Sequence, residues 1–224
     1  MQLGYIDYLN CYPFYYHMFE KEPVAETRIV AGYPSLLNRL MAEAYLDMSP
    51  ISSATCAELA KEVVVLPDFC LSSVGYVGSV MLVSKVPIEA LHHKRIGLTS
   101  ASHTSVVLLK MLLHQYYQIE PFYVATGPRP SLDMVDAALL IGNDAMQRRA
   151  KPDPYVYDLG DLWLRRTGFP VVFAVFAVRR KAILDHEDQI RAIIRSYKRS
   201  LACLHKERAQ MIWQARKRYS DIIY

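Results

Sequence analysis

Hydroxyl side chains gather in one short segment, Ser100-Ala-Ser102-His103-Thr104-Ser105, which lies between a strand-like and a helix-like stretch. Unpaired N–H groups and the positive dipole end at a helix N-terminus bind anions, and Ser and Thr hydroxyls add donors without adding charge. Ordinary capping uses one such hydroxyl. Because this segment holds four hydroxyls in six residues, we predict that Ser102, Thr104 and Ser105 bind an anionic ligand.

Further polar side chains follow predicted strands, where they face the ligand crevice in α/β sheets. They are Asn10, Ser52 with Ser53, and Asn143 with Asp144. Asn10 also fits a turn, and Pro34-Ser35 fits ordinary helix capping.

Near Asn10 five tyrosines either pack in the core or form an aromatic wall for a ring-shaped ligand. These are Tyr5, Tyr8, Tyr12, Tyr15 and Tyr16.

Other chemistries lack a supporting pattern. His92-His93-Lys94-Arg95 resembles a metal site only superficially, because adjacent residues point in opposite directions, and a solvated loop explains it better. The four cysteines show no CxxC pair, so neither a disulfide framework nor a zinc site is indicated. His103 lacks a nucleophile elbow, and neither a dinucleotide-binding glycine motif nor a P-loop is present. We therefore expect no cofactor and no metal.

Strand-like stretches alternate with helical ones, which predicts an α/β fold with mainly parallel sheets. A first block contains the helix 36–44 and a second block the helix 102–117. Each block places a hydroxyl-capped helix after a strand, and a later strand ends in small polar residues. The expected strands are Gln2–Ile6, Thr27–Ala31, Leu46–Ile51 and Val63–Pro67, then Arg95–Leu98, Pro121–Ala125 and Val135–Ile141.

Two apolar runs flank the second block, Val77–Val83 before it and Pro170–Val178 after it. The simplest topology crosses between two lobes along these runs, which describes a two-strand hinge with an interlobe ligand cleft. The predicted lobes are 1–82 with 180–224, and 83–179. A single continuous α/β domain is the alternative.

The net charge of +4 is concentrated near the end of the chain, since residues 179–218 hold twelve Lys or Arg against four Asp or Glu. Apolar residues from Asp188 to Tyr219 recur with helical period, which predicts one amphipathic helix with a solvated basic face, packed on the first lobe. No nucleic-acid-binding signature accompanies it.

The longest apolar run, Phe169–Val178, is too short to span a membrane, and no signal-peptide pattern is present. We expect a cytoplasmic protein without nucleic-acid or membrane partners.

Several short motifs occur in an order that resembles the chorismate dehydratase family of menaquinone biosynthesis, in the futalosine pathway. The resemblance covers about residues 3–180. The motifs include Gly4-Tyr-Ile-Asp-Tyr-Leu-Asn10, Gly32-Tyr-Pro-Ser35, Ser79-Val-Met-Leu-Val-Ser84, Ser102-His-Thr-Ser105, Ala138-Leu-Leu-Ile-Gly142, Tyr157-Asp-Leu-Gly160 and Thr167-Gly-Phe-Pro170.

This resemblance implies a two-lobed periplasmic-binding-protein-like fold of type II and a cofactor-free lyase. The implied reaction removes water from chorismate to give 3-[(1-carboxyvinyl)oxy]benzoate. Asn10 is then the catalytic candidate, holding the departing hydroxyl or the ring carboxylate, and no conventional general base stands in the strongest motifs. The remaining substrate-binding candidates are Ser52, Ser53, Ser84, Ser102, Thr104, Ser105 and Asn143.

The family commonly has Gly-Asp after its buried strand, whereas this chain has Gly142-Asn143-Asp144. Relatives also continue beyond the position of Tyr224, which implies a further C-terminal element. Two other functions remain open: 1,4-dihydroxy-6-naphthoate synthesis, which would employ a histidine such as His103, and non-catalytic binding of a small carboxylate. The expected partner is a small dicarboxylate, and the expected state is a monomer or homodimer.

Overall fold

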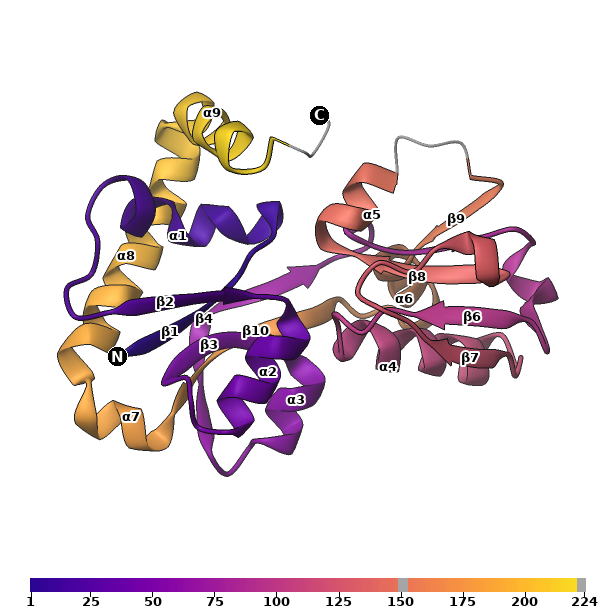
Figure 1. Cartoon of the computed structure of the whole chain (residues 1–224), viewed down its shortest axis with the longest axis horizontal. Helices are drawn as coiled ribbons and strands as arrows, with labels where there is room; N and C mark the ends of the chain where they lie inside the picture. Colours follow the sequence, from indigo (N-terminus) through magenta and orange to yellow (C-terminus); the bar gives the residue numbers. More distant parts are fainter. Residues whose placement is uncertain (149–152, 221–224) are drawn as a thin grey trace. The chain divides into compact units, whose positions relative to one another are not determined.

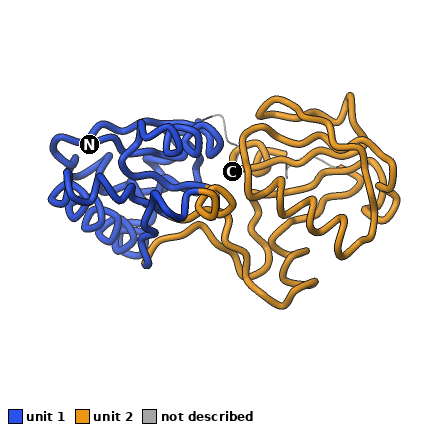
Figure 2. Tube along the Cα trace, turned by 90° about the horizontal axis from the view of Figure 1, so that it is seen from below, with its two compact units in different colours: residues 1–51, 59–67, 176–224 blue, residues 52–58, 68–175 orange. Residues whose placement is uncertain are grey.

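The computed structural model describes residues 1–148 and 153–220, which divide into two compact units. Unit 1 comprises Met1–Ile51, Leu59–Pro67 and Phe176–Tyr224, and unit 2 comprises Ser52–Glu58 and Asp68–Val175. Figure 2 colours the two units separately. The two five-stranded sheets and their helices make this an α/β protein, as the sequence predicts.

The first sheet has the strand order β2-β1-β3-β10-β4 (Figure 1). Strand β1 pairs in parallel with both β2 and β3, so the carboxyl ends of these three strands lie at one edge. The elements outside the second unit are β1 (Gln2–Ile6), η1 (Leu9–Cys11), α1 (Tyr12–Glu20), β2 (Arg28–Gly32), α2 (Pro34–Ala42), β3 (Met48–Ser52), α7 (Arg180–Asp185), α8 (Glu187–Lys206) and α9 (Arg208–Arg218).

The second sheet has the order β7-β6-β8-β5-β9. Strand β6 pairs in parallel with β7 and β8, whereas β5 runs antiparallel to both β8 and β9. Unit 2 contains α3 (Ser53–Glu58), β5 (Val80–Ser84), η2 (Ile88–Leu91), β6 (Arg95–Leu98), α4 (Thr104–Met111), the π-helix η3 (Leu112–Tyr116), β7 (Phe122–Ala125), η4 (Leu132–Met134), β8 (Ala137–Ile141), α5 (Gly142–Arg148), β9 (Tyr155–Asp158) and α6 (Leu159–Thr167).

Apart from residues 52–58, which belong to unit 2 between two segments of unit 1, the chain passes between the units within two strands, β4 (Val63–Ser73) and β10 (Val171–Arg179). The second of these is the run predicted to cross. The other predicted run, Val77–Val83, instead contains β5, which lies wholly inside unit 2 because it pairs with β8 and β9. The division therefore falls at residues 67/68 and 175/176, and α3 also belongs to unit 2.

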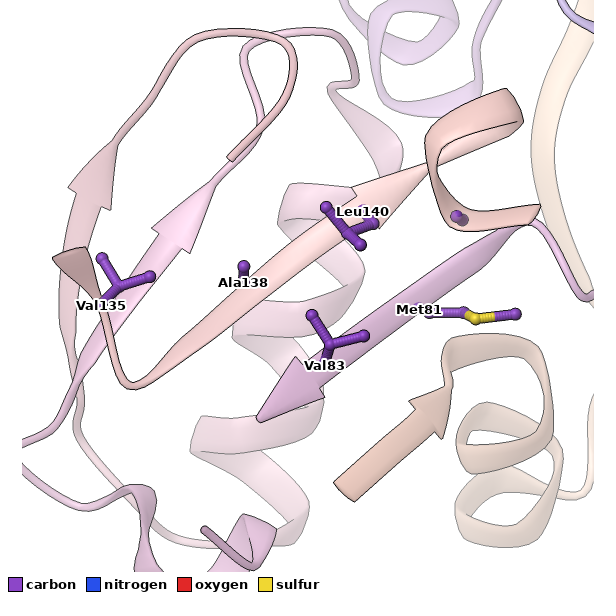
Figure 3. Close-up of a cluster of buried hydrophobic side chains, with 6 residues drawn as sticks. Met81, Val83, Val135, Ala138 and Leu140 are labelled. Atoms are coloured by element: carbon purple, nitrogen blue, oxygen red, sulfur yellow. The ribbon is translucent and has the colours of Figure 1, made fainter. Parts of the chain in front are cut away.

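A hydrophobic cluster forms on one face of the central strands of unit 2. Met81 and Val83 of β5 contact Ala138 and Leu140 of β8, and Val135 completes the same cluster with Ala145. Figure 3 shows the side chains of β5 and β8 side by side. Every residue of both strands is buried, which explains their continuous apolar sequence.

The five tyrosines near Asn10 are all buried in unit 1, so packing is confirmed and the aromatic wall was wrong. They occur on β1, on α1 and just after β1, and their rings meet mostly edge to face, for example Tyr5 with Tyr15 at 4.6 Å between centroids. Tyr12 and Tyr16 also pack against Met211, Ala215 and Tyr219. Helix α1 therefore contacts α9 through an aromatic core.

The predicted single C-terminal helix is two helices, α8 and α9, separated at Glu207, whose φ is −123° and ψ 30°. The carboxylate of Glu207 lies 2.8 Å from Lys21 Nζ and accepts a hydrogen bond from the Tyr16 hydroxyl at 3.3 Å. The break redirects α9 onto α1. At its end, the Tyr219 hydroxyl donates to Asp7 Oδ1 at 3.0 Å and is hydrogen-bonded to the Tyr5 hydroxyl.

Among the described residues, none of the helices combines the length and apolar character needed to cross a bilayer. His92 and His93 are exposed, and the described part of the chain contains no group of three potential metal-ligating side chains.

Candidate functional site

One edge of the second sheet collects the polar segments of unit 2. The carboxyl ends of β6 and β8 lie there because the two strands are parallel. Strand β5 is antiparallel to β8 and β9, so its first residue and the last residue of β9 lie at that edge too. The segments that meet there are 99–105, the start of α5 at 142–144, the junction of β9 and α6 at 158–160, and the loop 73–79. Ligands bind α/β sheets at such edges.

The predicted hydroxyl cluster forms at the N-terminus of α4. Ser102 Oγ accepts from the Ser105 amide at 3.2 Å and donates to Ser105 Oγ at 2.9 Å. Ser105 is 3% exposed, while Ser102 and Thr104 are half-buried. Ser102 therefore supplies the cap that the sequence predicted, and Ser105 and Thr104 add two further hydroxyls beside the same helix end.

A second segment, which starts at Ser53, joins this cluster inside unit 2. The Ala54 amide donates to Thr104 Oγ1 at 3.2 Å, and Thr55 Oγ1 is hydrogen-bonded to His103 Nδ1 at 3.0 Å. His103 Nε2 lies 3.8 Å from Glu58 Oε1. The structure thus brings the Ser53 segment and the 102–105 segment together, although 50 residues separate Ala54 from Thr104.

The cluster suits a carboxylate. The first N–H groups of a helix have no partner within the helix, and the dipole favours a negative charge there. One of these groups, the Ser105 amide, is already taken by Ser102. The hydroxyls of Ser105 and Thr104 and the remaining amides of the first turn can donate hydrogen bonds to an anion, and none of these groups carries a full positive charge.

Asn143 lies at the same edge, in the first turn of α5, directly after β8. Its neighbour Asp144 forms an ion pair with Arg129, with 3.1 Å between Oδ1 and Nε. Sequence reasoning missed Arg129, because it lies in an irregular loop after β7 whose path only the sheet pairing fixes. The Arg129 guanidinium therefore compensates the charge of the Asp144 carboxylate at this edge of the sheet.

Three of the serines predicted to bind substrate either lie away from the hydroxyl cluster or donate their hydroxyl to a backbone carbonyl. Ser84 pairs with Ala137, the first residue of β8, so it lies at the opposite edge of the sheet from Ser102. Its hydroxyl donates to the Val86 carbonyl at 2.7 Å. Ser53 donates to the Val172 carbonyl at 2.7 Å, and Ser52 is buried at the end of β3.

Asn10 belongs to unit 1, where η1 presents it as an exposed residue four positions after β1 ends. Its Oδ1 accepts a weak hydrogen bond from the Cys11 thiol at 3.6 Å. Burial raises the pKa of the Cys11 thiol far above its ordinary value. Cys11 therefore stays protonated and is no nucleophile, which leaves the Asn10 amide as the polar group offered at this position.

Asp158 is a structural residue of this edge that sequence reasoning did not single out. Its carboxylate accepts from the amides of Val77 and Gly78 at 3.0 and 2.7 Å, and from those of Gly160 and Asp161 at 3.0 and 3.1 Å. The same carboxylate therefore caps α6 and also holds the loop that contains Val77 and Gly78, before β5. The pattern Asp-Leu-Gly before a helical stretch is an N-cap signal that could have revealed the first half of this role.

The described residues thus form two α/β units, one of which has a cluster of hydroxyls at the N-terminus of a helix, and solved structures share this fold. A crystal structure of protein AF1704 from Archaeoglobus fulgidus matches with a TM-score of 0.77 at 22% identity, covering 100% of this chain and 83% of that one. The periplasmic aliphatic sulphonate binding protein SsuA from Escherichia coli matches with a TM-score of 0.63 at 16% identity, covering 98% of this chain and 78% of that one. The fold is the periplasmic-binding-protein-like fold.

Sequence comparison is more specific. A family model described as menaquinone biosynthesis matches residues 1–221. A chorismate dehydratase from Thermus thermophilus is 33% identical over 195 residues, which are 80% of this chain and 70% of that relative. The chain belongs to the menaquinone biosynthesis family, as the order of its motifs predicts.

Proposed function

We propose that the protein is a chorismate dehydratase, a lyase that removes water from chorismate to give 3-[(1-carboxyvinyl)oxy]benzoate. The observation that carries the proposal is the neutral hydroxyl cluster of Ser102, Thr104 and Ser105 at the N-terminus of α4. Chorismate is a dicarboxylate, and this cluster suits a carboxylate. The similarity to the Thermus thermophilus chorismate dehydratase supports the choice of substrate.

The reaction needs little acid–base machinery. The ring loses the proton from the carbon that bears the enolpyruvyl ether and hydroxide from the neighbouring carbon, and the electron pair of the broken C–H bond completes the aromatic ring. Aromatisation supplies the driving force, so the protein chiefly orients the substrate. Asn10 holds the departing hydroxyl or the ring carboxylate, and the substrate's own enolpyruvyl carboxylate takes the proton. A cytoplasmic location and a monomeric or homodimeric state remain predictions.

The test is incubation of the purified chain with chorismate, followed by mass analysis for the loss of one water. Asn10→Ala is expected to lower turnover strongly, and wild-type turnover in that variant would refute the role of Asn10. Ser102→Ala is expected to raise KM. Its matched control is Ser131→Ala, because Ser131 also accepts an amide hydrogen bond, from Asp133, and is exposed in the loop before β8. Both variants lose one cap, so only substrate binding should distinguish them.

The two alternative functions give different results in the same experiment. Binding of chorismate without a product would indicate a non-catalytic carboxylate-binding protein. Turnover of a later cyclic intermediate, but not of chorismate, would indicate 1,4-dihydroxy-6-naphthoate synthesis. His103→Gln would then abolish activity, whereas the dehydratase is expected to tolerate it because His103 Nδ1 is engaged with Thr55.

A further inference from the structure

The loop Ser73–Ser79 lies at the same edge of unit 2 as the hydroxyl cluster. It leads into β5, whose first residue, Val80, pairs with Ile141 at the carboxyl end of β8. The Gly142 amide donates to the Ser79 carbonyl at 2.7 Å. In the sheet, only β8 separates β5 from β6, the strand that leads to the cluster. At about 4.8 Å per strand the two loops start about 10 Å apart, the length of a small ring with carboxylate substituents.

The backbone of this loop is held by side chains at both of its ends. Asp158 accepts from the amides of Val77 and Gly78, and Ser73 Oγ lies 2.7 and 3.0 Å from the carbonyls of Gly75 and Tyr76. Gly75 and Gly78 have φ of 85° and 73°, a region that glycine adopts without steric cost. These bonds fix the loop in one conformation.

The tip of the loop is nevertheless apolar and exposed. Val74 is 78% and Tyr76 54% exposed, and the segment from Ser73 to Ser79 contains no charged residue. The Tyr76 ring lies over Gly78, where an added Cβ would stand 3.2 Å from Cε1. A loop whose backbone makes five hydrogen-bond contacts thus carries an exposed aromatic side chain at the same edge of unit 2 as the hydroxyl cluster.

We infer that Tyr76 is a specificity-determining residue, whose ring packs against the six-membered ring of the substrate while the hydroxyl cluster binds a carboxylate. This inference rests on the proposed function for the identity of the substrate. Its physical basis is that an aromatic side chain on a preordered loop offers contact area at low entropic cost. The buried tyrosines of unit 1 offer no such face.

The experiment compares the wild-type chain with Tyr76→Ala, Tyr76→Phe and Tyr155→Ala. Tyr155 is the matched control, since it is an exposed tyrosine (37%) on β9 that pairs with Ser84 at the opposite edge of the sheet. For each variant, kcat and KM are measured with chorismate. Calorimetry gives the Kd of the product 3-[(1-carboxyvinyl)oxy]benzoate and of succinate, a dicarboxylate without a ring.

Tyr76→Ala is expected to raise KM and the Kd of the product about threefold to tenfold, with kcat and the affinity for succinate little changed. Tyr76→Phe and Tyr155→Ala are expected to match the wild type. The inference would be overturned by unchanged KM and Kd in Tyr76→Ala, or by an equal loss of affinity in Tyr155→Ala. It would also be overturned if the wild-type chain did not bind the product. If the wild type binds the product through Tyr76 but does not dehydrate chorismate, the proposed function fails while the ring contact stands.

Discussion

Replacing Gly160 by alanine tests how tightly Asp158 and its loop are locked. A Cβ at residue 160 would stand 2.3 Å from the Gly75 carbonyl oxygen and 3.2 Å from Asp158 Oδ1. The first contact is with backbone, so no side-chain rotation relieves it. The loop must move away, and the bonds from the Val77 and Gly78 amides to Asp158 are the first to lengthen.

The expected loss follows from those two bonds. Hydrogen bonds to a charged group contribute about 1.5–3 kcal/mol each, so their loss costs about 3–6 kcal/mol. Alanine in place of glycine within a helix returns about 1 kcal/mol, which leaves a net destabilisation of about 2–5 kcal/mol. At about 3 °C per kcal/mol for a chain of this size, Tm falls by roughly 6–15 °C.

The assay is thermal unfolding by circular dichroism, together with hydrogen exchange of the peptide that contains Val77 and Gly78. Gly127→Ala is the matched control, because no atom lies within 4 Å of an added Cβ there, and it should change Tm little. Gly160→Ala should also speed exchange of the two amides. A Gly160→Ala protein with wild-type Tm and wild-type exchange would refute the locked loop.

Two further predictions concern unit 1. A hydrogen bond from Lys21 lowers the pKa of Glu207. The pair therefore stabilises the fold above the unfolded pKa of about 4.3, and this stabilisation is lost as pH falls through the folded pKa. Glu207→Gln should lower Tm at neutral pH by an amount that shrinks in acid, whereas a pH-independent difference in Tm would contradict the ion pair. At Gly4, an added Cβ would stand 2.1 Å from Ser49 Oγ and 2.7 Å from Ser49 Cβ, so Gly4→Ala should lower the free energy of unfolding by about 1–3 kcal/mol. Denaturant unfolding should show that Ser49→Gly in the same chain recovers most of this loss. A double variant as unstable as Gly4→Ala alone would count against the clash.

Local patterns predicted most of the elements. The bounds of β1 and β6 match the expected strands Gln2–Ile6 and Arg95–Leu98, and Ser102 caps α4 as its place before the helix indicates. These features depend on residues a few positions apart. The α8–α9 break at Glu207 was missed because its partners, Lys21 and Tyr16, lie nearly two hundred positions earlier in the chain.

The candidate site shows the same limit. The hydroxyls of residues 102–105 could be predicted from their place after a strand, but their contacts with Ala54 and Thr55 depend on α3 belonging to unit 2. Ser84 looked equivalent to the other serines, because strand direction cannot be read from an apolar run. The antiparallel pairing of β5 places it at the far edge.

The contact of α1 and β1 with α9 also sets an order for folding during synthesis. The packing of Tyr12 and Tyr16 against α9 and the hydrogen bond between Tyr5 and Tyr219 can form only when Tyr219 has been made, 214 positions after Tyr5. At 5–20 residues per second the ribosome needs about 10–40 s to cover that interval. Residues 68–175 form an almost continuous unit, so they can fold within that time, whereas the contacts of β1 and α1 with α9 form only after the C-terminal helix has been made.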